Sequence, residues 1–276
     1  MTRKNYFELI QNMGFDADKE FEMISILISN SKEKPPNITE SLSSVFNKNF
    51  WLYENYRKIQ FRSYDDVKNY FENNFSGNDR LFAYTEFIID LNSFLRSSEI
   101  SFLDKITLTK QFPKVKKRID YFLAKTNHEL KELEDGRQII IEKNVYASEV
   151  SQILSETSIQ DAIKVLEYNH FANKGNTQRK EEILFSLAKY LEPFRNELNA
   201  SEELKEVMKV KNKKIIAVDK LFDMYNNLEL RHNNNLEMTE EELEQWYDDI
   251  YISTLFVILS LDEARILSKL KTLRNG

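Results

Sequence analysis

The fold class of this chain is decided by residues 240–273, EEELEQWYDDIYISTLFVILSLDEARILSKLKTL. Apolar side chains recur there every three or four residues, as one face of a helix requires. They are Leu243, Trp246, Ile250, Val257, Leu261 and Ala264. Thr239 followed by Glu242 fits a capping box at the start of this stretch. The pattern predicts one long amphipathic helix.

Two further amphipathic stretches, residues 178–199 and 213–228, come before it. Pro193 falls inside the first, where a missing backbone N–H should kink the helix. Three long helices with short links predict an antiparallel bundle over residues 111–276. Helical patterns at 39–46, 64–75 and 78–97 predict a separate N-terminal helical domain over residues 1–110.

Other local signals complete the expected architecture. Pro113 is expected to open a helix, and the aromatic residues between Phe46 and Phe94 are attributed to packing rather than to base stacking. Asp135-Gly136 is a strong turn signal, and residues 137–141 are rich in β-branched side chains. We therefore expect an all-α protein with one small β-hairpin near Gly136.

The composition excludes several classes of function. The 276 residues include five glycines, none close enough to another for a P-loop or a Rossmann fingerprint. There is no cysteine, which removes disulfides and thiol catalysis. His128, His170 and His232 are too dispersed for a His-x-x-x-His metal pair. We expect neither a metal nor a cofactor.

Charge and hydropathy bear on location and partners. The net charge is −6, yet residues 105–118 and 205–214 are rich in lysine and arginine. Each basic stretch is either a solvated helix face or a strip that contacts phosphates. The most apolar segment, residues 250–261, is too short for the roughly twenty residues of a membrane span. We expect a cytoplasmic protein.

One segment between the last two helices is unusual, YNNLELRHNNNL at residues 225–236. Asparagines there can cap the end of a helix, and arginine and histidine complement the helix dipole. The alternative is that this polar segment is a functional site.

The residues LFDMYNNLELRHNN (221–234), EQWYDD (244–249) and RKEEILFSLAKYLE (179–192) resemble the C-terminal region of AbiJ-type abortive infection proteins, a member group of the HEPN superfamily of four-helix bundles. The resemblance covers roughly residues 120–261. It implies antiphage defence by a metal-independent ribonuclease that dimerises across its active loop and answers to a phage-derived trigger or partner protein. It also implies that Glu192 faces that loop. The usual motif has a histidine five or six positions after the arginine, whereas His232 directly follows Arg231.

In such a ribonuclease, His232 serves as the base and Arg231 stabilises the charge on the phosphate, with Glu192 orienting Arg231. The expected substrate-binding residues are Asn227, Asn233, Asn234, Lys211, Lys213 and Lys214. Side chains of helical neighbours diverge by about 100°, so Arg231 and His232 can converge only where the helix has ended.

Two other interpretations stay open. The first is a non-catalytic helical module that binds nucleic acid or a phage protein through the same segment. The second is a structural helical protein in which Arg231 and His232 only cap a helix.

Overall fold

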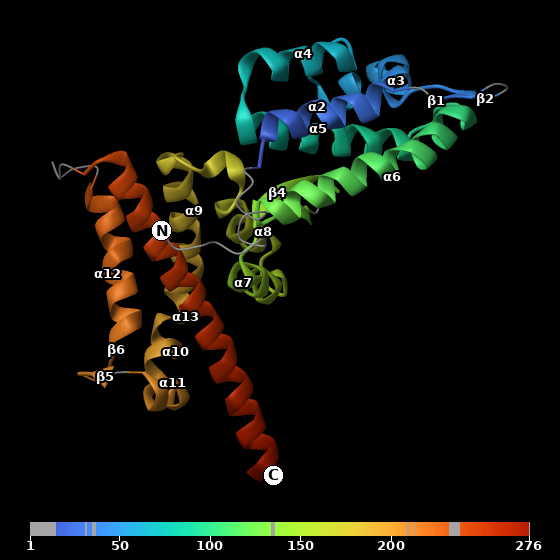
Figure 1. Ribbon diagram of the computed structural model, residues 1–276. Coiled ribbons are helices and arrows are strands. Elements are labelled where there is room, and N and C mark those ends of the chain that lie inside the picture. Colours follow the sequence, from blue (N-terminus) through green and yellow to red (C-terminus); the bar gives the residue numbers. More distant parts are fainter. Residues whose placement is uncertain are drawn as a thin grey trace, which may run out of the picture. The chain divides into compact units, whose positions relative to one another are not determined.

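The computed structural model describes residues 15–275 apart from 31, 35–36, 134–135, 209, 213 and 232–237. The chain divides into two compact units, Met1–Ile140 and Ile141–Gly276 (Figure 1). Both units are built of helices with short two-stranded sheets, which confirms the all-α expectation. The division falls at Ile140 rather than at residue 110.

The described elements of the first unit run in the order α2 (Ala17–Ser29), β1 (Lys32–Lys34), β2 (Asn37–Thr39), α3 (Leu42–Arg57), α4 (Tyr64–Asn74), α5 (Gly77–Ser97), α6 (Phe102–Lys125) and β3 (His128–Glu132). Strand β4 (Gln138–Glu142) begins in this unit and runs across the division at Ile140. Aromatic side chains fill its core: Phe46, Phe50, Tyr64 and Tyr84 are fully buried. The hydroxyls of Tyr64 and Tyr84 hydrogen-bond to each other, which satisfies both groups inside the core. These contacts confirm packing for the buried aromatics of this region, whereas Trp51 and Tyr56 are exposed.

Pro113 does not open a helix, because α6 begins at Phe102 and continues through the proline. Phe112 and Val115 are buried on either side of it, and their packing outweighs the single lost backbone hydrogen bond. Since α6 packs against α2, α3 and α5, it crosses residue 110 as part of the first unit.

The basic stretch 105–118 is largely a solvated face of α6. Lys110 and Lys117 are exposed, and Lys116 pairs with Asp120 one turn away at 2.7 Å. Arg118 instead turns inward and makes two hydrogen bonds to the carboxylate of Glu20. The arrangement favours the structural interpretation of this stretch.

The hairpin near Gly136 is confirmed as β3 and β4. Gly136 has φ +77°, a left-handed conformation that glycine adopts without strain. The sheets β1–β2 and β5–β6 (Val210–Lys211 and Lys214–Ile215) were not expected, which corrects the prediction of a single hairpin. Strands of two or three residues are too short to carry an alternating pattern.

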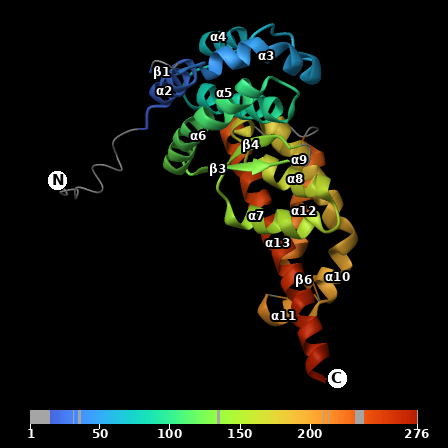
Figure 2. The same cartoon turned by 90° about the vertical axis from the view of Figure 1, so that its right-hand side faces the viewer.

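The second unit continues with α7 (Val145–Ser155), α8 (Ile159–Tyr168), η1 (Phe171–Asn173), α9 (Thr177–Leu191), η2 (Glu192–Phe194), α10 (Arg195–Ala200), α11 (Glu202–Val207), β5, β6, α12 (Ile216–Arg231) and α13 (Glu240–Asn275). Helices α9, α12 and α13 lie side by side and enclose the core (Figures 1 and 2). Pro193 interrupts its helix rather than kinking it: α9 ends at Leu191, and α10 starts after a short 3-10 turn.

The expected core face of α13 is confirmed, since Ile250, Val257, Leu261 and Ala264 are all buried. The capping box is also confirmed. The Thr239 N–H donates to the Glu242 carboxylate at 2.9 Å, and the Glu242 N–H donates to Thr239 Oγ1 at 3.2 Å. None of the described helices is long and apolar enough to cross a membrane.

Candidate functional site

The candidate catalytic segment lies between the last two helices. Helix α12 ends at Arg231 and α13 begins at Glu240. His232, Asn233 and Asn234 lie outside the described residues, as do Lys213 and the side chains of Asn227 and Arg231. The structure therefore fixes Arg231 as the final residue of α12, and fixes the two helices that bring the chain into and out of the segment.

Helix α12 is anchored to α13 by a buried polar contact. Thr254 Oγ1 donates to the Ile250 carbonyl at 2.7 Å, so the hydrogen bond between Tyr225 and Thr254 has the tyrosine hydroxyl as donor. Burial raises the pKa of Tyr225, which keeps its hydroxyl protonated. This contact holds the second half of α12 in place six residues before Arg231.

Glu192 is not placed beside Arg231 within one copy of the chain. It is exposed at the junction of α9 and η2, three residues before Arg195, whose guanidinium lies 3.5 Å from Asp219. Asp219 belongs to the first turn of α12. Arg231 is twelve residues further on, about 18 Å along a helix of 1.5 Å rise per residue. The expectation that Glu192 orients Arg231 is not met by this arrangement.

The candidate lysines are likewise at the far end of α12. Lys211 and Lys214 lie on the β5–β6 hairpin, directly before Ile216, the first residue of the helix. Lys214 Nζ is 3.2 Å from Asp219 Oδ1, so its charge is partly neutralised. The length of α12 separates both lysines from Arg231 by roughly 22 Å. They do not join the Arg231–His232 segment in one site.

A polar cluster that the sequence did not reveal lies at the start of α13. Lys180 of α9 has a side chain that is only 8% exposed, and its Nζ lies 2.7 Å from both Glu244 Oε1 and Asp248 Oδ1. Glu244 also accepts the Gly175 N–H at 2.7 Å, and Asp248 accepts the Tyr168 hydroxyl at 2.8 Å. The ammonium group is 5.1 Å from the centre of the Tyr168 ring.

Stacked tyrosines form the floor of this cluster. The rings of Tyr168 and Tyr251 are 3.9 Å apart and nearly parallel. Tyr251 donates to the Val165 carbonyl and accepts from Asn169, each at 2.7 Å. Burial raises the pKa of both tyrosines, and Asp248 raises that of Tyr168 further. Neither hydroxyl can therefore act as a base near neutral pH, and the cluster ties α8 and α9 to α13.

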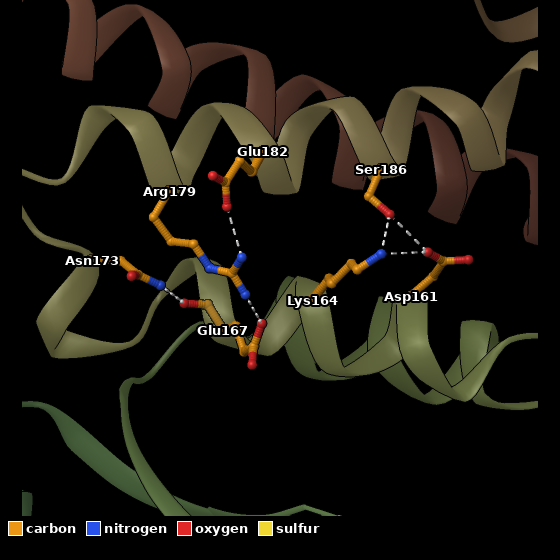
Figure 3. Close-up of polar contacts among 7 residues, drawn as sticks. All are labelled: Asp161, Lys164, Glu167, Asn173, Arg179, Glu182 and Ser186. Atoms are coloured by element: carbon orange, nitrogen blue, oxygen red, sulfur yellow. Dashed lines mark hydrogen bonds and ion pairs between the residues drawn. The ribbon is translucent and has the colours of Figure 1, made fainter.

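A second polar seam joins α8 to α9 (Figure 3). Arg179 bridges Glu167 and Glu182 at 3.0 and 2.9 Å. Further along the same two helices, Ser186 Oγ of α9 accepts a hydrogen bond from Lys164 Nζ of α8 and donates one to Asp161 Oδ1 of α8. A serine next to a lysine is a pattern of nucleophilic catalysis, which requires a neutral lysine. Here Lys164 Nζ also lies 3.8 Å from Asp161 Oδ1, so the ammonium, the hydroxyl and the carboxylate together form an ion-paired contact between α8 and α9.

The sequence carries one signal for the Lys180 cluster. Lys180 lies three and four residues before Ile183 and Leu184, on the apolar face of α9. A lysine on such a face must find carboxylates, because an unpaired charge is costly to bury. The signal predicts that the lysine is paired, but it does not identify Glu244 and Asp248, which are more than sixty residues away.

The first turn of α13 makes the surroundings of the candidate segment acidic. Glu240, Glu241 and Glu242 are all exposed. Hydrogen bonds from the Thr239 N–H and hydroxyl hold the pKa of Glu242 below its usual range, so it stays ionised. A phosphate at the segment must be attracted by Arg231 and His232 against this negative charge.

Comparisons with protein-family models, with curated proteins and with solved structures found no match. Among the residues that the structure describes, no three His, Asp or Glu side chains are grouped so that they could hold a metal ion.

Proposed function

We propose that this protein is an antiphage abortive-infection effector that cleaves RNA in the cytoplasm without a metal ion, through Arg231 and His232. The observation that carries the proposal is the end of α12 at Arg231. Within a helix the two side chains would diverge by about 100°, so the end of α12 is where a guanidinium and the next imidazole can meet on one phosphate.

The chemistry follows from the two residue types. His232 accepts the proton of the RNA 2′-hydroxyl, whose oxygen attacks the adjacent phosphorus. The bond to the 5′-oxygen breaks, and that oxygen takes a proton from water, whose hydroxide then accepts the proton held by the His232 imidazolium. Arg231 stabilises the negative charge that grows on the phosphorane oxygens through its planar donor groups. The products carry a 2′,3′-cyclic phosphate and a 5′-hydroxyl.

Other residues have supporting roles in this proposal. Asn227, Asn233 and Asn234 supply amide groups that bind phosphate or base. Lys211 and Lys214 lie about one helix length away, so they contact only a strand that continues along α12. A homodimer paired across the segment adds a second Arg231 and His232 to the site, whereas Glu192, beside the first turn of α12, takes no part in it.

The direct test is cleavage of RNA by the purified full chain in EDTA. We expect the parent protein to release 2′,3′-cyclic phosphate ends, and His232→Ala to be slower by at least about 100-fold, the usual contribution of a general base. His170→Ala is the matched control, because His170 belongs to the same unit but follows α8. Equal cleavage by the parent and by His232→Ala would falsify the assignment.

A cellular test covers an effector that needs a trigger. The parent and an Arg231→Ala, His232→Ala double variant are induced with and without phage infection, and growth and total RNA are followed. We expect arrest and RNA decay with the parent only. Equal arrest from both proteins removes this segment from the mechanism.

The alternative is a non-catalytic module that binds nucleic acid or a phage protein through the same segment. The exposed acids at the start of α13 favour it, because they oppose a polyanion and suit a basic protein surface. The cleavage tests above separate the ribonuclease from this alternative. An RNA titration at two salt concentrations then separates a nucleic-acid-binding module, whose phosphate contacts weaken steeply with salt, from a structural protein that does not bind RNA at either.

A further inference from the structure

Helix α13 has a second apolar face that points away from its own core. Ile252, Phe256, Ile266, Leu270 and Leu273 are 58%, 51%, 42%, 56% and 78% exposed. The buried face, by contrast, is formed by Ile250, Val257, Leu261 and Ala264. Since scattered single apolar residues are normal on a surface but a continuous stripe is not, the outer face needs an explanation.

The outer stripe follows a strict heptad. Ile252, Leu259, Ile266 and Leu273 are spaced by seven residues, and Phe256 and Leu270 occupy the second apolar position of the repeat. Leu259 is half-buried and also packs against the core of its own unit, whereas the other five are exposed. A sustained seven-residue spacing with two apolar positions is the pattern by which two helices coil around each other. The stripe runs over 22 residues, from Ile252 to Leu273, about 32 Å of helix.

The shape of the second unit leaves this stripe accessible. Residues 266–273 are exposed all around the helix. The last part of α13 continues past α10 and α11, as both views show (Figures 1 and 2). Contacts of Arg265 with Glu197 and of Lys271 with Glu203 hold one side of this part against α10 and α11. The heptad side remains for a second helix.

We propose that α13 pairs with α13 of a second copy of this chain in an antiparallel coiled coil. Charge supports this partner and this direction. Residues 240–249 contain six acids and no base, whereas residues 264–275 contain four bases and no acid. In the antiparallel register that the heptad spacing sets, Asp248 and Asp249 of one copy come level with residues 274 and 273 of the other, so acidic and basic positions meet at both ends of one symmetric interface. Parallel pairing sets the acidic ends side by side and places Glu263 against Glu263.

The heptad fixes the register. Ile252 faces Leu270 of the second copy, Phe256 faces its Ile266, and Leu259 faces its Glu263. The two-fold axis then passes level with Leu261. Glu263 is the one polar residue within the stripe between Ile252 and Leu273. A polar group at such a position costs stability and specifies the register.

This dimer does not depend on the ribonuclease proposal. It sets the starts of the two α13 helices roughly 60 Å apart, so each Arg231–His232 segment lies at its own end of the dimer. It is therefore a different contact from a dimer paired across that segment. Loss of the dimer and loss of RNA cleavage can be measured separately.

Because the chain has no cysteine, single cysteine variants report on contacts between copies alone. We expect Ser260→Cys, next to the axis, to form covalent dimers with a short bis-maleimide. Ile252→Cys should cross-link only when mixed with Leu270→Cys. Self-linking of Ile252→Cys without the second variant indicates parallel pairing and overturns the antiparallel arrangement.

Sedimentation of the full chain tests the interface without cysteines. Leu270→Glu should weaken the dimer by about 100-fold or more, since each copy buries an unpaired charge. Glu263→Leu should tighten it. The matched control is Tyr146→Glu, a 64% exposed aromatic on α7 away from the stripe. A monomeric parent without cross-links, or a dimer that Leu270→Glu leaves unchanged, overturns the proposal.

Discussion

The Lys180 cluster offers a quantitative prediction about stability. Replacing Lys180 by methionine keeps the aliphatic stem and removes the ammonium group that lies 2.7 Å from both Glu244 and Asp248. Breaking a buried ion pair costs about 3–5 kcal/mol, because the remaining charge loses its partner. Here the two carboxylate side chains are 22% and 45% exposed and keep their bonds from Gly175 and Tyr168. Water therefore offsets part of the loss, and we expect about 2–3 kcal/mol.

The assay must report on the second unit alone, since two units can unfold separately. The chain has two tryptophans: Trp51 lies on α3 of the first unit and Trp246 on α13 of the second. In a Trp51→Phe background, urea unfolding followed by fluorescence reads Trp246. Lys189→Met is the control, because Lys189 is exposed on the same helix. We expect it to change the free energy of unfolding by less than about 0.5 kcal/mol.

The same experiment can refute the reasoning. If Lys180→Met and Lys189→Met have equal effects, the buried ammonium does not hold α9 to α13. A loss well above about 5 kcal/mol would also contradict the estimate, because it requires carboxylates that stay dehydrated after the lysine is removed.

Three more outcomes follow from the described contacts. Burial raises the pKa of Glu244, but hydrogen bonds from Lys180 and the Gly175 N–H outweigh it, so the pKa is lowered from its ordinary 4.5. The stability that this shift contributes is present above pH 4.5 and is lost as the pH falls through the lowered pKa. We expect Lys180→Met to weaken this loss of stability at acid pH, measured by urea unfolding at several pH values. Thr254→Val leaves the buried Tyr225 hydroxyl without its acceptor and should lower the free energy of unfolding by about 1–3 kcal/mol, measured with urea. Tyr225→Phe should lower it by less, and equal losses would contradict the assignment of Tyr225 as the donor. Gly136→Ala should lower the stability of the first unit by about 1 kcal/mol in thermal unfolding, because φ is +77° and an L side chain is strained there, although among the described residues none beyond its chain neighbours comes within 4 Å of the added methyl group. An unchanged melting temperature would contradict this cost.

Periodicity predicted the long helices because each has one continuous apolar face. The buried residues of α13 recur every three or four positions, as the sequence pattern predicted, and the capping box predicted where the helix starts. The prediction that a helix starts at Pro113 was wrong. Local propensity favours a helix start there, but Phe112 and Val115 pack in the core, so α6 continues through the proline. That error also displaced the expected boundary between the two units.

The candidate site could be predicted only in part. The end of a helix near Arg231 followed from the asparagines, which favour helix ends. The positions of Glu192 and of the hairpin lysines depend on the break at Pro193 and on how α12 packs, which no local pattern specifies. The partners of Lys180 are set by tertiary packing, and no spacing rule links residues so distant along the chain.

The shared role of α13 has a consequence for biosynthesis. Because this helix contacts α7, α9, α11 and α12, the apolar core residues of the second unit stay exposed to water until residues 240–264 have left the ribosome. The first unit contains its own core and can mature earlier. A premature stop codon within α13 is therefore expected to leave a finished first unit attached to an unfolded, protease-sensitive remainder.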